Sequence, residues 1–387
     1  AEESALFERG IGGATDVVAK ELYRLAPHAE DSTPLALRPE ATAGILRAYI
    51  QHGMRSAPQP VRLVTVAPFF RHDRPQKGRY RQFTQFNVEA IGDAGPGIDI
   101  EVIELGASFL KQLGLTDVEV HFNSVGCSDC RPAYAAALRA HFAPIEGELG
   151  EVDRTRLRDN PLRLLDSKDA AAVRRAESAP ALPGHLCDAC AAHADVVRAG
   201  LAVAGVKVID APRLVRGLDY YNLTVFEWVT DQLGSQGTVC AGGRYDGLFE
   251  QIGGKAAPAV GWALGMERIL ELLKEQGRLP EQPTPDAYAV VPDAGSVPRV
   301  MPVLRALRQQ GVQVQMHAGG AEGMGSMKSQ FKKADASGAR FALVFGPDEV
   351  AQGTVSVKPL RDGGEQLRQP LNDVSAWAPA LRVGRPS

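Results

Sequence analysis

Three arginines at the ends of separate predicted elements are the residues best suited to chemistry in this sequence of 387 residues. Arg71 follows one β-prone run, Arg216 lies in another, and Arg268 lies in the first turn of a predicted helix over residues 266–276. The sequence spacing indicates no Asp or Glu partner for any of the three. Guanidinium groups grip phosphate oxygens, and the start of a helix favours negative charge. The pattern therefore indicates a multiply charged anion such as a nucleoside triphosphate.

A predicted hairpin carries further polar groups. Residues 61–70 and 81–91 are β-prone and flank a loop, and five of the eleven residues from 71 to 81 are Lys or Arg. Side chains alternate across a strand, so Phe83, Gln85, Asn87 and Glu89 should share one face. A core face is seldom so polar. We interpret it as the lining of a site; a solvated hairpin on an antiparallel sheet is the alternative.

Glu40 and Thr42 lie at a predicted corner, where a strand ends at Pro39 and a helix over residues 42–52 begins. A polar group at such a corner can face a ligand without disturbing either element. The sequence contains no Gly-x-x-x-x-Gly-Lys-Ser/Thr loop and no Gly-x-Gly-x-x-Gly after a strand. A bound nucleotide would therefore be held by side chains on an antiparallel sheet.

Two Cys-x-x-Cys pairs, Cys127 with Cys130 and Cys187 with Cys190, have the spacing of a structural zinc site. Reduced thiols that pack two helices without a metal are the alternative. Cys240 lies on a predicted core strand and is most simply a small buried residue.

Composition indicates a globular protein of two or three domains, with a formal charge of −3. No apolar run approaches the ~20 residues of a membrane helix and no signal peptide is visible, so we expect a cytoplasmic protein. The chain begins with Ala rather than Met, so we expect further sequence before it. Residues 284–387 carry 12 Lys+Arg and 9 Asp+Glu, a balance of +3 in an otherwise acidic chain.

The periodicity divides the chain into four parts. Residues 1–123 and 206–278 should form one α+β domain, which begins with a short helix, a glycine break and a strand within residues 4–25 and includes a strand over 214–228. Residues 124–205 read as a helical insertion, and the proline-rich residues 279–283 as a linker. Residues 284–387 alternate strand and helix, ending in a helix over 371–381, which predicts a mainly parallel α/β domain with helices on both faces.

Four segments resemble the class II aminoacyl-tRNA synthetases, specifically the histidyl family. Residues 70–83 (FRHDRPQKGRYRQF) are similar to the second class II motif, and residues 265–268 (GMER) to the third. Residues 214–221 (LVRGLDYY) and 241–246 (AGGRYD) resemble two segments peculiar to the histidyl enzymes. The resemblance implies an α+β catalytic domain on an antiparallel sheet with a helical insertion, followed by an α/β anticodon-binding domain.

The resemblance also implies an activity, the formation of histidyl adenylate from histidine and ATP with Mg²⁺, followed by transfer to tRNA. For ATP, Arg71 would brace the α-phosphate, Phe83 and Arg268 would sandwich the adenine, and Arg79 and Arg268 would reach the terminal phosphates. Arg216 would bridge the α-phosphate and the substrate carboxylate. The residues implied for histidine are Glu40, Thr42 and Gln85 around its amino group, and Glu89, Tyr221 and Tyr245 around its imidazole.

Transfer RNA would meet two parts of the chain. Arg74 and Gln76 in the hairpin loop are candidates for the acceptor end, and Lys328, Lys332 and Lys333 form a basic face on a predicted helix. The family implies a homodimer, although its first motif is incomplete here. Asp73 stands where many relatives have Glu.

Two other classes of protein remain as alternatives. A histidine-binding regulator of the same fold would lack some catalytic arginines and the C-terminal domain. An RNA-binding scaffold without chemistry would not explain Glu40, Gln85, Glu89 and Tyr221.

Overall fold

The computed structural model describes residues 1–13, 15–27, 29, 32–233, 237–280, 283–317, 319–320, 323–361 and 363–382. The chain divides into two compact units, Ala1–Leu279 and Pro280–Ser387. None of the described helices is both long enough and apolar enough to traverse a lipid bilayer.

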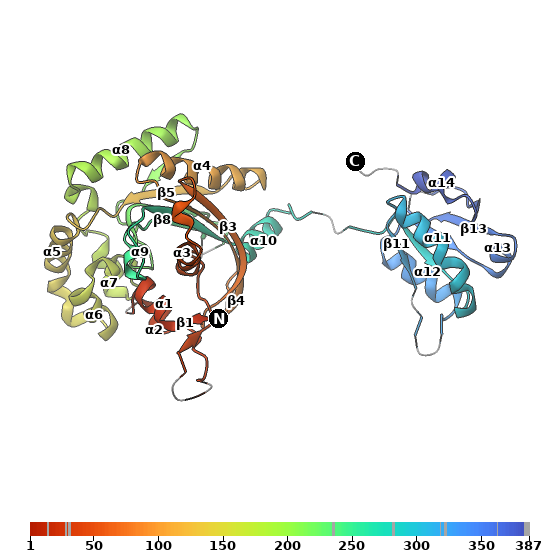
Figure 1. Cartoon of the computed structure of the whole chain (residues 1–387), viewed down its shortest axis with the longest axis horizontal. Helices are drawn as coiled ribbons and strands as arrows, with labels where there is room; N and C mark the ends of the chain where they lie inside the picture. Colours follow the sequence, from red (N-terminus) through yellow and green to blue (C-terminus); the bar gives the residue numbers. More distant parts are fainter. Residues whose placement is uncertain are drawn as a thin grey trace. The chain divides into compact units, whose positions relative to one another are not determined.

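A seven-stranded sheet organises the first unit, in the order β3-β4-β9-β8-β7-β5-β6 (Figure 1). Every pairing is antiparallel except that of β5 with β6. The strands are β3 (Val61–Phe70), β4 (Gln82–Ile91), β5 (Glu119–Ser124), β6 (Val208–Asp210), β7 (Asn222–Val229), β8 (Thr238–Arg244) and β9 (Ala259–Gly265). A short ribbon of β1 (Glu2–Glu3) and β2 (Leu35–Ala36) lies apart from this sheet. The predicted antiparallel sheet is confirmed.

Two long helices cover one face of the sheet. These are α4 (Pro96–Gln112) and α8 (Asp188–Val203), which lie above the strands in Figure 1, whereas α3 (Thr42–Gln51) lies on the opposite side. Beneath α4 and α8, Val88, Trp228 and Trp262 belong to one buried apolar cluster. Apolar burial on this face leaves the opposite face of the same strands for polar groups.

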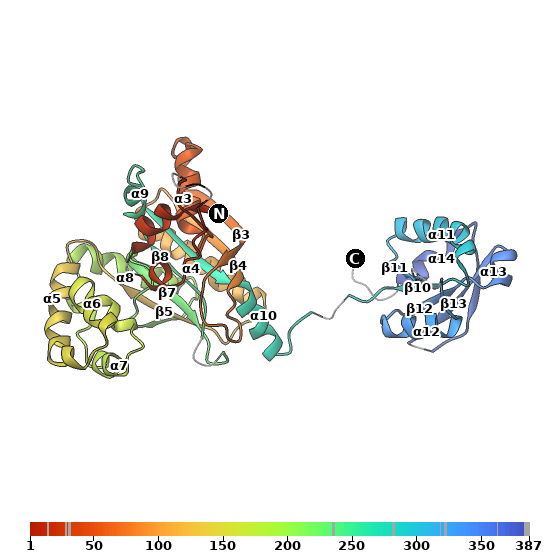
Figure 2. The ribbon, with the colours of Figure 1, turned by 90° about the horizontal axis from the view of Figure 1, so that it is seen from below.

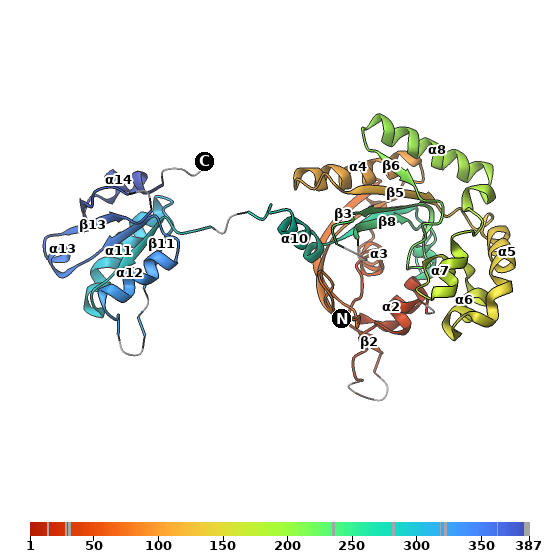
Figure 3. The same ribbon diagram turned by 180° about the vertical axis from the view of Figure 1, so that it is seen from behind.

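Residues 131–203 form only helices, as the sequence predicts. They are α5 (Arg131–Phe142), α6 (Glu151–Asp159), α7 (Ala170–Ala176) and α8, with the 3-10 turns η3 (Ala143–Glu148), η4 (Pro161–Asp166) and η5 (Leu182–His185). Figures 2 and 3 show α5, α6 and α7 gathered beside β5, at the far side of the sheet from β3. Leu138 and Phe142 of α5 share an apolar cluster with Phe7 and Tyr49, so this segment packs into the first unit.

Two predicted strands in the first unit are wrong. The N-terminal segment forms helices α1 (Ser4–Phe7), η1 (Glu8–Gly12) and α2 (Asp16–Ala19), because the Thr15 side chain accepts the Val18 N–H and caps α2. The strand expected over 214–228 begins only at Asn222. The remaining helices of this unit are η2 (Met54–Ser56), α9 (Leu248–Gln251) and α10 (Met266–Glu275).

The second unit is a five-stranded sheet in the order β11-β10-β12-β13-β14. The prediction of a mainly parallel sheet is wrong, because β10 pairs in parallel with β11 and β12 but β13 is antiparallel to both β12 and β14. The strands are β10 (Ala287–Val290), β11 (Val314–Met316), β12 (Phe341–Val344), β13 (Thr354–Pro359) and β14 (Leu367–Pro370). The helices are η7 (Ala294–Ser296), α11 (Val297–Gln309), α12 (Met327–Ala336), α13 (Pro347–Ala351), α14 (Val374–Trp377) and η8 (Ala378–Arg382).

Helices cover both faces of this second sheet. Ala287 and Ala289 of β10 belong to the apolar cluster that contains α11, whereas Tyr288 and Val290 belong to a separate cluster with α12. The predicted final helix over 371–381 is shorter than expected, since α14 ends at Trp377 and a 3-10 turn follows.

Candidate active site

A cavity of about 240 Å³ opens on the polar face of the large sheet. It is lined by β4, β8 and β9, by the corner before α3, by the hairpin loop and by the segment 216–221. Ten of the residues predicted for histidine and ATP line it together: Glu40, Thr42, Arg71, Arg79, Phe83, Gln85, Arg216, Tyr221, Tyr245 and Arg268. These residues are far apart in the sequence, and the folding of the chain around the sheet brings them together.

Strand β4 supplies the floor. Phe83, Gln85 and Asn87 all line the cavity, which is the shared face that the alternation of side chains predicts. Gln85 Oε1 is buried and accepts no hydrogen bond from the described part of the chain. A buried acceptor without a donor is costly, so this oxygen is suited to a donor on a ligand.

Glu89 follows on β4 but does not itself line the cavity, and it is 2% exposed. Its carboxyl group accepts hydrogen bonds from Thr42 Oγ1, at 2.7 Å, and from the hydroxyl of Tyr245. Burial raises the pKa of Glu89 to about 8, although the two hydrogen bonds oppose that rise. Burial therefore favours the protonated form of this carboxyl group.

Two glycines make room for these groups. Glu89 faces Gly261 across β4 and β9, and a Cβ added at Gly261 would lie 1.8 Å from Glu89 Oε2. A Cβ added at Gly243 on β8 would lie 2.8 Å from Tyr221 Cδ1. Any larger residue at either position would displace a side chain at this end of the cavity.

Glu40 is buried and its carboxyl group accepts the backbone N–H groups of Thr42, at 2.7 Å, and Ala43, at 2.9 Å. It thus binds free N–H groups in the first turn of α3. Burial raises the pKa of Glu40, and these N–H groups oppose the rise. The helix start therefore fixes the direction in which this carboxyl group faces the cavity.

Three tyrosines surround the same end of the cavity. The ring centroids of Tyr220 and Tyr221 lie 4.6 Å apart, and Tyr220 and Tyr245 form an edge-to-face pair at 5.6 Å. Tyr220 lines the cavity but is absent from the sequence prediction. Its place in the Asp-Tyr-Tyr segment was the available signal. Tyr220 and Tyr221 lie outside any strand, however, so no alternation of side chains shows which of the two faces the cavity.

Arg71 and Phe83 form one flank. The Arg71 guanidinium lies 5.4 Å from the centre of the Phe83 ring, and its Nε donates to the carbonyl of Pro39 at 2.9 Å. Burial lowers the pKa of Arg71 from its ordinary value, but an arginine remains charged at neutral pH. Arg268 Nη1 donates to the carbonyl of Thr238 on β8. A flat cationic and aromatic surface suits a purine ring and phosphates.

The expectation that these arginines have no acidic partner is wrong for Arg216, which forms an ion pair with Glu227 on β7. Burial alone would lower the pKa of Arg216, but Glu227 together with Tyr221 and Tyr220 outweighs it, and the pKa is raised. Thr238 Oγ1 donates to the second oxygen of Glu227 at 3.0 Å. Arg79 likewise pairs with Asp73. Pairs formed by irregular segments are invisible to sequence spacing.

The candidates for tRNA lie elsewhere. Arg74 and Gln76 belong to the hairpin loop but do not line the cavity, and Gln76 forms a backbone turn with Arg79. Lys328 and Lys332 are exposed on α12 in the second unit.

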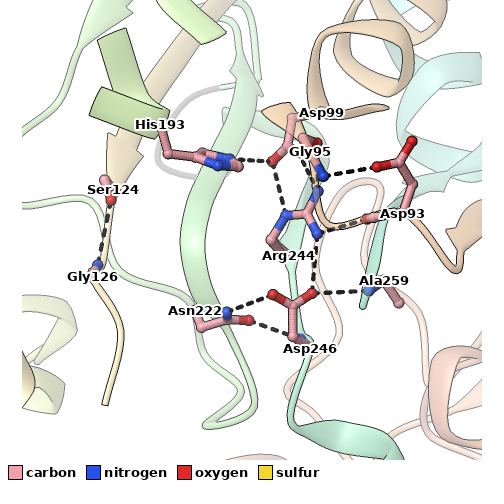
Figure 4. A network of polar contacts seen from close by, with 10 residues as sticks. All are labelled: Asp93, Gly95, Asp99, Ser124, Gly126, His193, Asn222, Arg244, Asp246 and Ala259. Atoms are coloured by element: carbon pink, nitrogen blue, oxygen red, sulfur yellow. Dashed lines mark hydrogen bonds and ion pairs between the residues drawn. The ribbon is translucent and has the colours of Figure 1, made fainter. Parts of the chain in front are cut away.

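A buried ionic cluster joins β8 to the helices α4 and α8 (Figure 4). Arg244 is fully buried, contacts Asp99 through Nε and Nη2, and donates from Nη1 to Asp246 at 3.1 Å. His193 of α8 lies 3.5 Å from Asp99, and Asn222 donates to Asp246 at 3.0 Å. The cluster ties β8 to α4 and α8 immediately before Tyr245, and no local sequence pattern indicates it.

The four cysteines of the two Cys-x-x-Cys pairs converge. Their sulfur atoms all lie within 4.8 Å of one another, with Cys127–Cys130 and Cys130–Cys190 both at 3.7 Å and Cys127–Cys187 at 4.0 Å. Four thiolates around one zinc ion, each about 2.3 Å from it, have sulfur atoms about 3.8 Å apart. The cluster therefore fits a tetrahedral zinc ion.

Comparison with known proteins matches both units. A family model described as histidyl-tRNA synthetase matches residues 7–269, and one described as anticodon binding domain matches residues 289–381. A histidine–tRNA ligase of Acidovorax ebreus is 55% identical over 99% of this chain and 90% of its own length. The ligase of Dechloromonas aromatica is 48% identical, over 97% of this chain and 86% of its own.

Solved structures agree. The crystal structure of apo S. aureus histidyl-tRNA synthetase superposes with a TM-score of 0.77 at 31% identity, covering 97% of this chain and 89% of that one. A Bacillus halodurans protein titled ATP phosphoribosyltransferase regulatory subunit/histidyl-tRNA synthetase has a TM-score of 0.55 at 23% identity, and covers 80% of each chain. The second likeness concerns the fold alone.

Proposed function

Because the chain belongs to the histidyl-tRNA synthetase family and is a histidine–tRNA ligase, we propose that its cavity holds ATP and histidine side by side. In the first step, a carboxylate oxygen of histidine attacks the α-phosphorus and the bond to pyrophosphate breaks. In the second step, a ribose hydroxyl at the 3′ end of tRNA attacks the acyl carbon and AMP leaves. The observation that carries this assignment is that the arginines predicted for ATP line one cavity with the polar groups predicted for histidine, except Glu89, which bonds two of the lining residues, Thr42 and Tyr245.

The ATP end is formed by the arginines and Phe83. Arg71 binds the α-phosphate, Phe83 and Arg268 enclose the adenine, and Arg79 and Arg268 reach the terminal phosphates. Arg216 bridges the α-phosphate and the histidine carboxylate, where negative charge is redistributed during the reaction. Positioned cations of this kind lower the barrier without a protein nucleophile.

The histidine end is formed by the buried polar groups. Glu40, Thr42 and Gln85 receive the α-amino group, a role that suits the unmatched acceptor oxygen of Gln85. Glu89, Tyr221 and Tyr245 surround the imidazole. A site built to hydrogen-bond both ring nitrogens rejects amino acids that leave its polar groups unmatched.

Mg²⁺ would neutralise phosphate charge. The cavity's carboxylates are already engaged: Glu40 with the start of α3, Asp73 with Arg79, and Glu267 with the N–H of Thr84 at 2.8 Å. Mg²⁺ commonly keeps waters and binds through substrate phosphates. We therefore expect it to enter with ATP, with few ligands from the protein.

Histidine-dependent exchange of pyrophosphate into ATP tests the first step directly. The enzyme should exchange only when histidine is present. A protein that binds histidine but catalyses no exchange would instead be a regulator of the same fold.

A structural zinc ion in the cysteine cluster is the second part of the proposal. It would join the start of α5, which follows Cys130, to the start of α8, which follows Cys187. Reduced thiols without a metal remain the alternative.

The purified protein should contain one zinc ion per chain by atomic emission, and Cys130→Ser should lose it and melt at a lower temperature. Removing a ligand leaves the other thiolates without the ion that holds them together. Cys240→Ala is the matched control, because Cys240 lies on β8 outside the cluster and should leave zinc content unchanged. Metal-free wild-type protein with five titratable thiols would contradict the proposal.

A homodimer in the cytoplasm is the expected form. β3 is an edge strand of the sheet, and Val64 and Val66 on it are 62% and 55% exposed. Apolar side chains on an open edge strand favour cover by another chain. Free cysteines fit a reducing compartment.

We expect tRNA to contact Arg74 and Gln76 with its acceptor end and α12 with its anticodon arm. The double change Lys328→Glu and Lys332→Glu should raise the KM for tRNA about tenfold, because two cations near phosphates become anions. Pyrophosphate exchange should not change. Arg305→Glu on α11 is the control, since α11 covers the opposite face of that sheet. Equal effects of both variants on tRNA would exclude a specific role for α12.

A further inference from the structure

The segment 214–221 carries Arg216 and Tyr221 into the cavity, yet it has no strand or helix to hold it. β7 begins only at Asn222. A catalytic cation on an irregular segment needs contacts from outside the sheet to fix its position. These contacts come largely from the helical segment between β5 and β6.

Arg163 of η4 makes three of these contacts with a single guanidinium. Its Nη1 donates to the carbonyl oxygen of Arg216 at 3.0 Å. Its Nε donates to Asp219 Oδ1 at 3.0 Å, and its Nη2 lies 2.8 Å from the same oxygen. Asn160, just before η4, also donates to Asp219 Oδ1, at 2.9 Å. The side chain of Arg163 is 12% exposed, so solvent screens this ion pair only partly.

Arg131, the first residue of α5, contacts the far end of the same segment. Its Nη2 donates to the carbonyl oxygen of Tyr221. A small hollow of about 60 Å³ between the helices and the segment is lined by Arg131, Arg163, Asp219 and Arg216. Two arginines of the helical segment thus hold the main chain on either side of the Gly-Leu-Asp-Tyr stretch.

We propose that Arg163 is a positioning residue for adenylate formation, acting through Arg216. The planar guanidinium spans the Arg216 carbonyl and the Asp219 carboxylate, and so it fixes the path of the chain between residues 216 and 219. That path sets where the Arg216 side chain meets the α-phosphate. The inference rests on the proposed role of Arg216, and it gives the helical insertion a part in the chemistry.

Arg163→Met should lower kcat for pyrophosphate exchange about 10²-fold, since a displacement of about 1 Å at a reacting centre can cost that much. The KM for ATP should stay within about twofold, because Arg71 and Arg268 are untouched. Arg163→Lys should have a kcat between those of the wild type and Arg163→Met, because an ammonium keeps the charge but lacks the planar fork of a guanidinium. Unchanged kcat in Arg163→Met would overturn the proposal.

The double variant Arg163→Met with Arg216→Ala separates positioning from a general structural role. If Arg163 acts through Arg216, adding Arg163→Met to Arg216→Ala should have no further effect on the rate of adenylate formation. Additive losses would show that Arg163 acts elsewhere and would contradict the proposal.

Arg158→Met is the matched control, because Arg158 lies in the same helical segment, is 72% exposed and pairs with its neighbour Asp159. It should leave kcat unchanged. If Arg163→Met does not fold, Asp219→Asn probes the same ion pair from the other side and should also lower kcat with little effect on KM; no effect there would refute the inference. Wild-type enzyme without histidine-dependent exchange would instead refute the proposed function.

Discussion

Arg216→Ala should slow the formation of histidyl adenylate by about 10²–10³-fold, the typical cost of losing one positioned group that stabilises transition-state charge. The Arg216 side chain is 19% exposed and pairs with Glu227, which raises its pKa, so it is a permanent cation that water screens only partly. The rate should be measured in a single turnover by rapid quench, which separates chemistry from product release. A near-normal rate would exclude the role.

Part of that loss would come from Glu227, which the variant leaves without its cation near the phosphates. The double variant Arg216→Ala with Glu227→Gln separates the two effects. If it recovers part of the rate, repulsion by the unpaired carboxylate contributed to the loss. Glu227→Gln alone should be mildly slower than wild type, since Thr238 still contacts the side chain at that position.

Glu89→Ala should raise the KM for histidine about 10²–10³-fold while the KM for ATP changes little. The change removes the contact that we propose for the imidazole, together with a carboxyl group that accepts from Thr42 and Tyr245, so two buried hydroxyls lose their acceptor. Steady-state pyrophosphate exchange with each substrate varied in turn provides the measurement. An unchanged KM for histidine would contradict the assignment.

The isosteric change Glu89→Gln gives a pH signature. Because burial raises the pKa of folded Glu89 to about 8, above its ordinary value of 4.5, the folded state holds more protons between those two values. The stability that the protonated group contributes is complete below about 4.5 and is lost as the pH rises through about 8. In thermal melts from pH 6 to 9, the melting temperature of the wild type should therefore fall relative to that of Glu89→Gln as the pH rises. Parallel curves would show that Glu89 does not titrate in this range.

Regular structure explains what the sequence could predict. The hairpin of β3 and β4 and the shared face of Phe83, Gln85 and Asn87 follow from the two-residue period of a strand, which needs no knowledge of neighbours. The motif resemblance placed Arg71, Arg216 and Arg268, and the structure brings all three into one cavity. The histidyl-tRNA synthetase fold was predicted and is confirmed.

Long-range partners explain what the sequence could not predict. Glu227 reaches Arg216 across an irregular segment, and Arg163 reaches Asp219 from 56 residues away. No local pattern encodes either pair. The error in the second sheet has a different cause: the edge strand β14 is only Leu-Arg-Gln-Pro and lacks an apolar alternation, and the direction of β13 relative to β12 is set by their pairing.

The buried cluster around Arg244 determines which substitutions the protein can tolerate. Arg244 and Asp99 are both fully buried, and removing one member of such a pair leaves an uncompensated charge in the interior. A single substitution there is therefore expected to be strongly destabilising, whereas a joint replacement of both by apolar residues can be neutral. Asp246 contacts Arg244 and His193 contacts Asp99, so these two residues would lose a partner in the joint replacement. The strand that presents Tyr245 is thus held in place by a set of residues that can be exchanged only together.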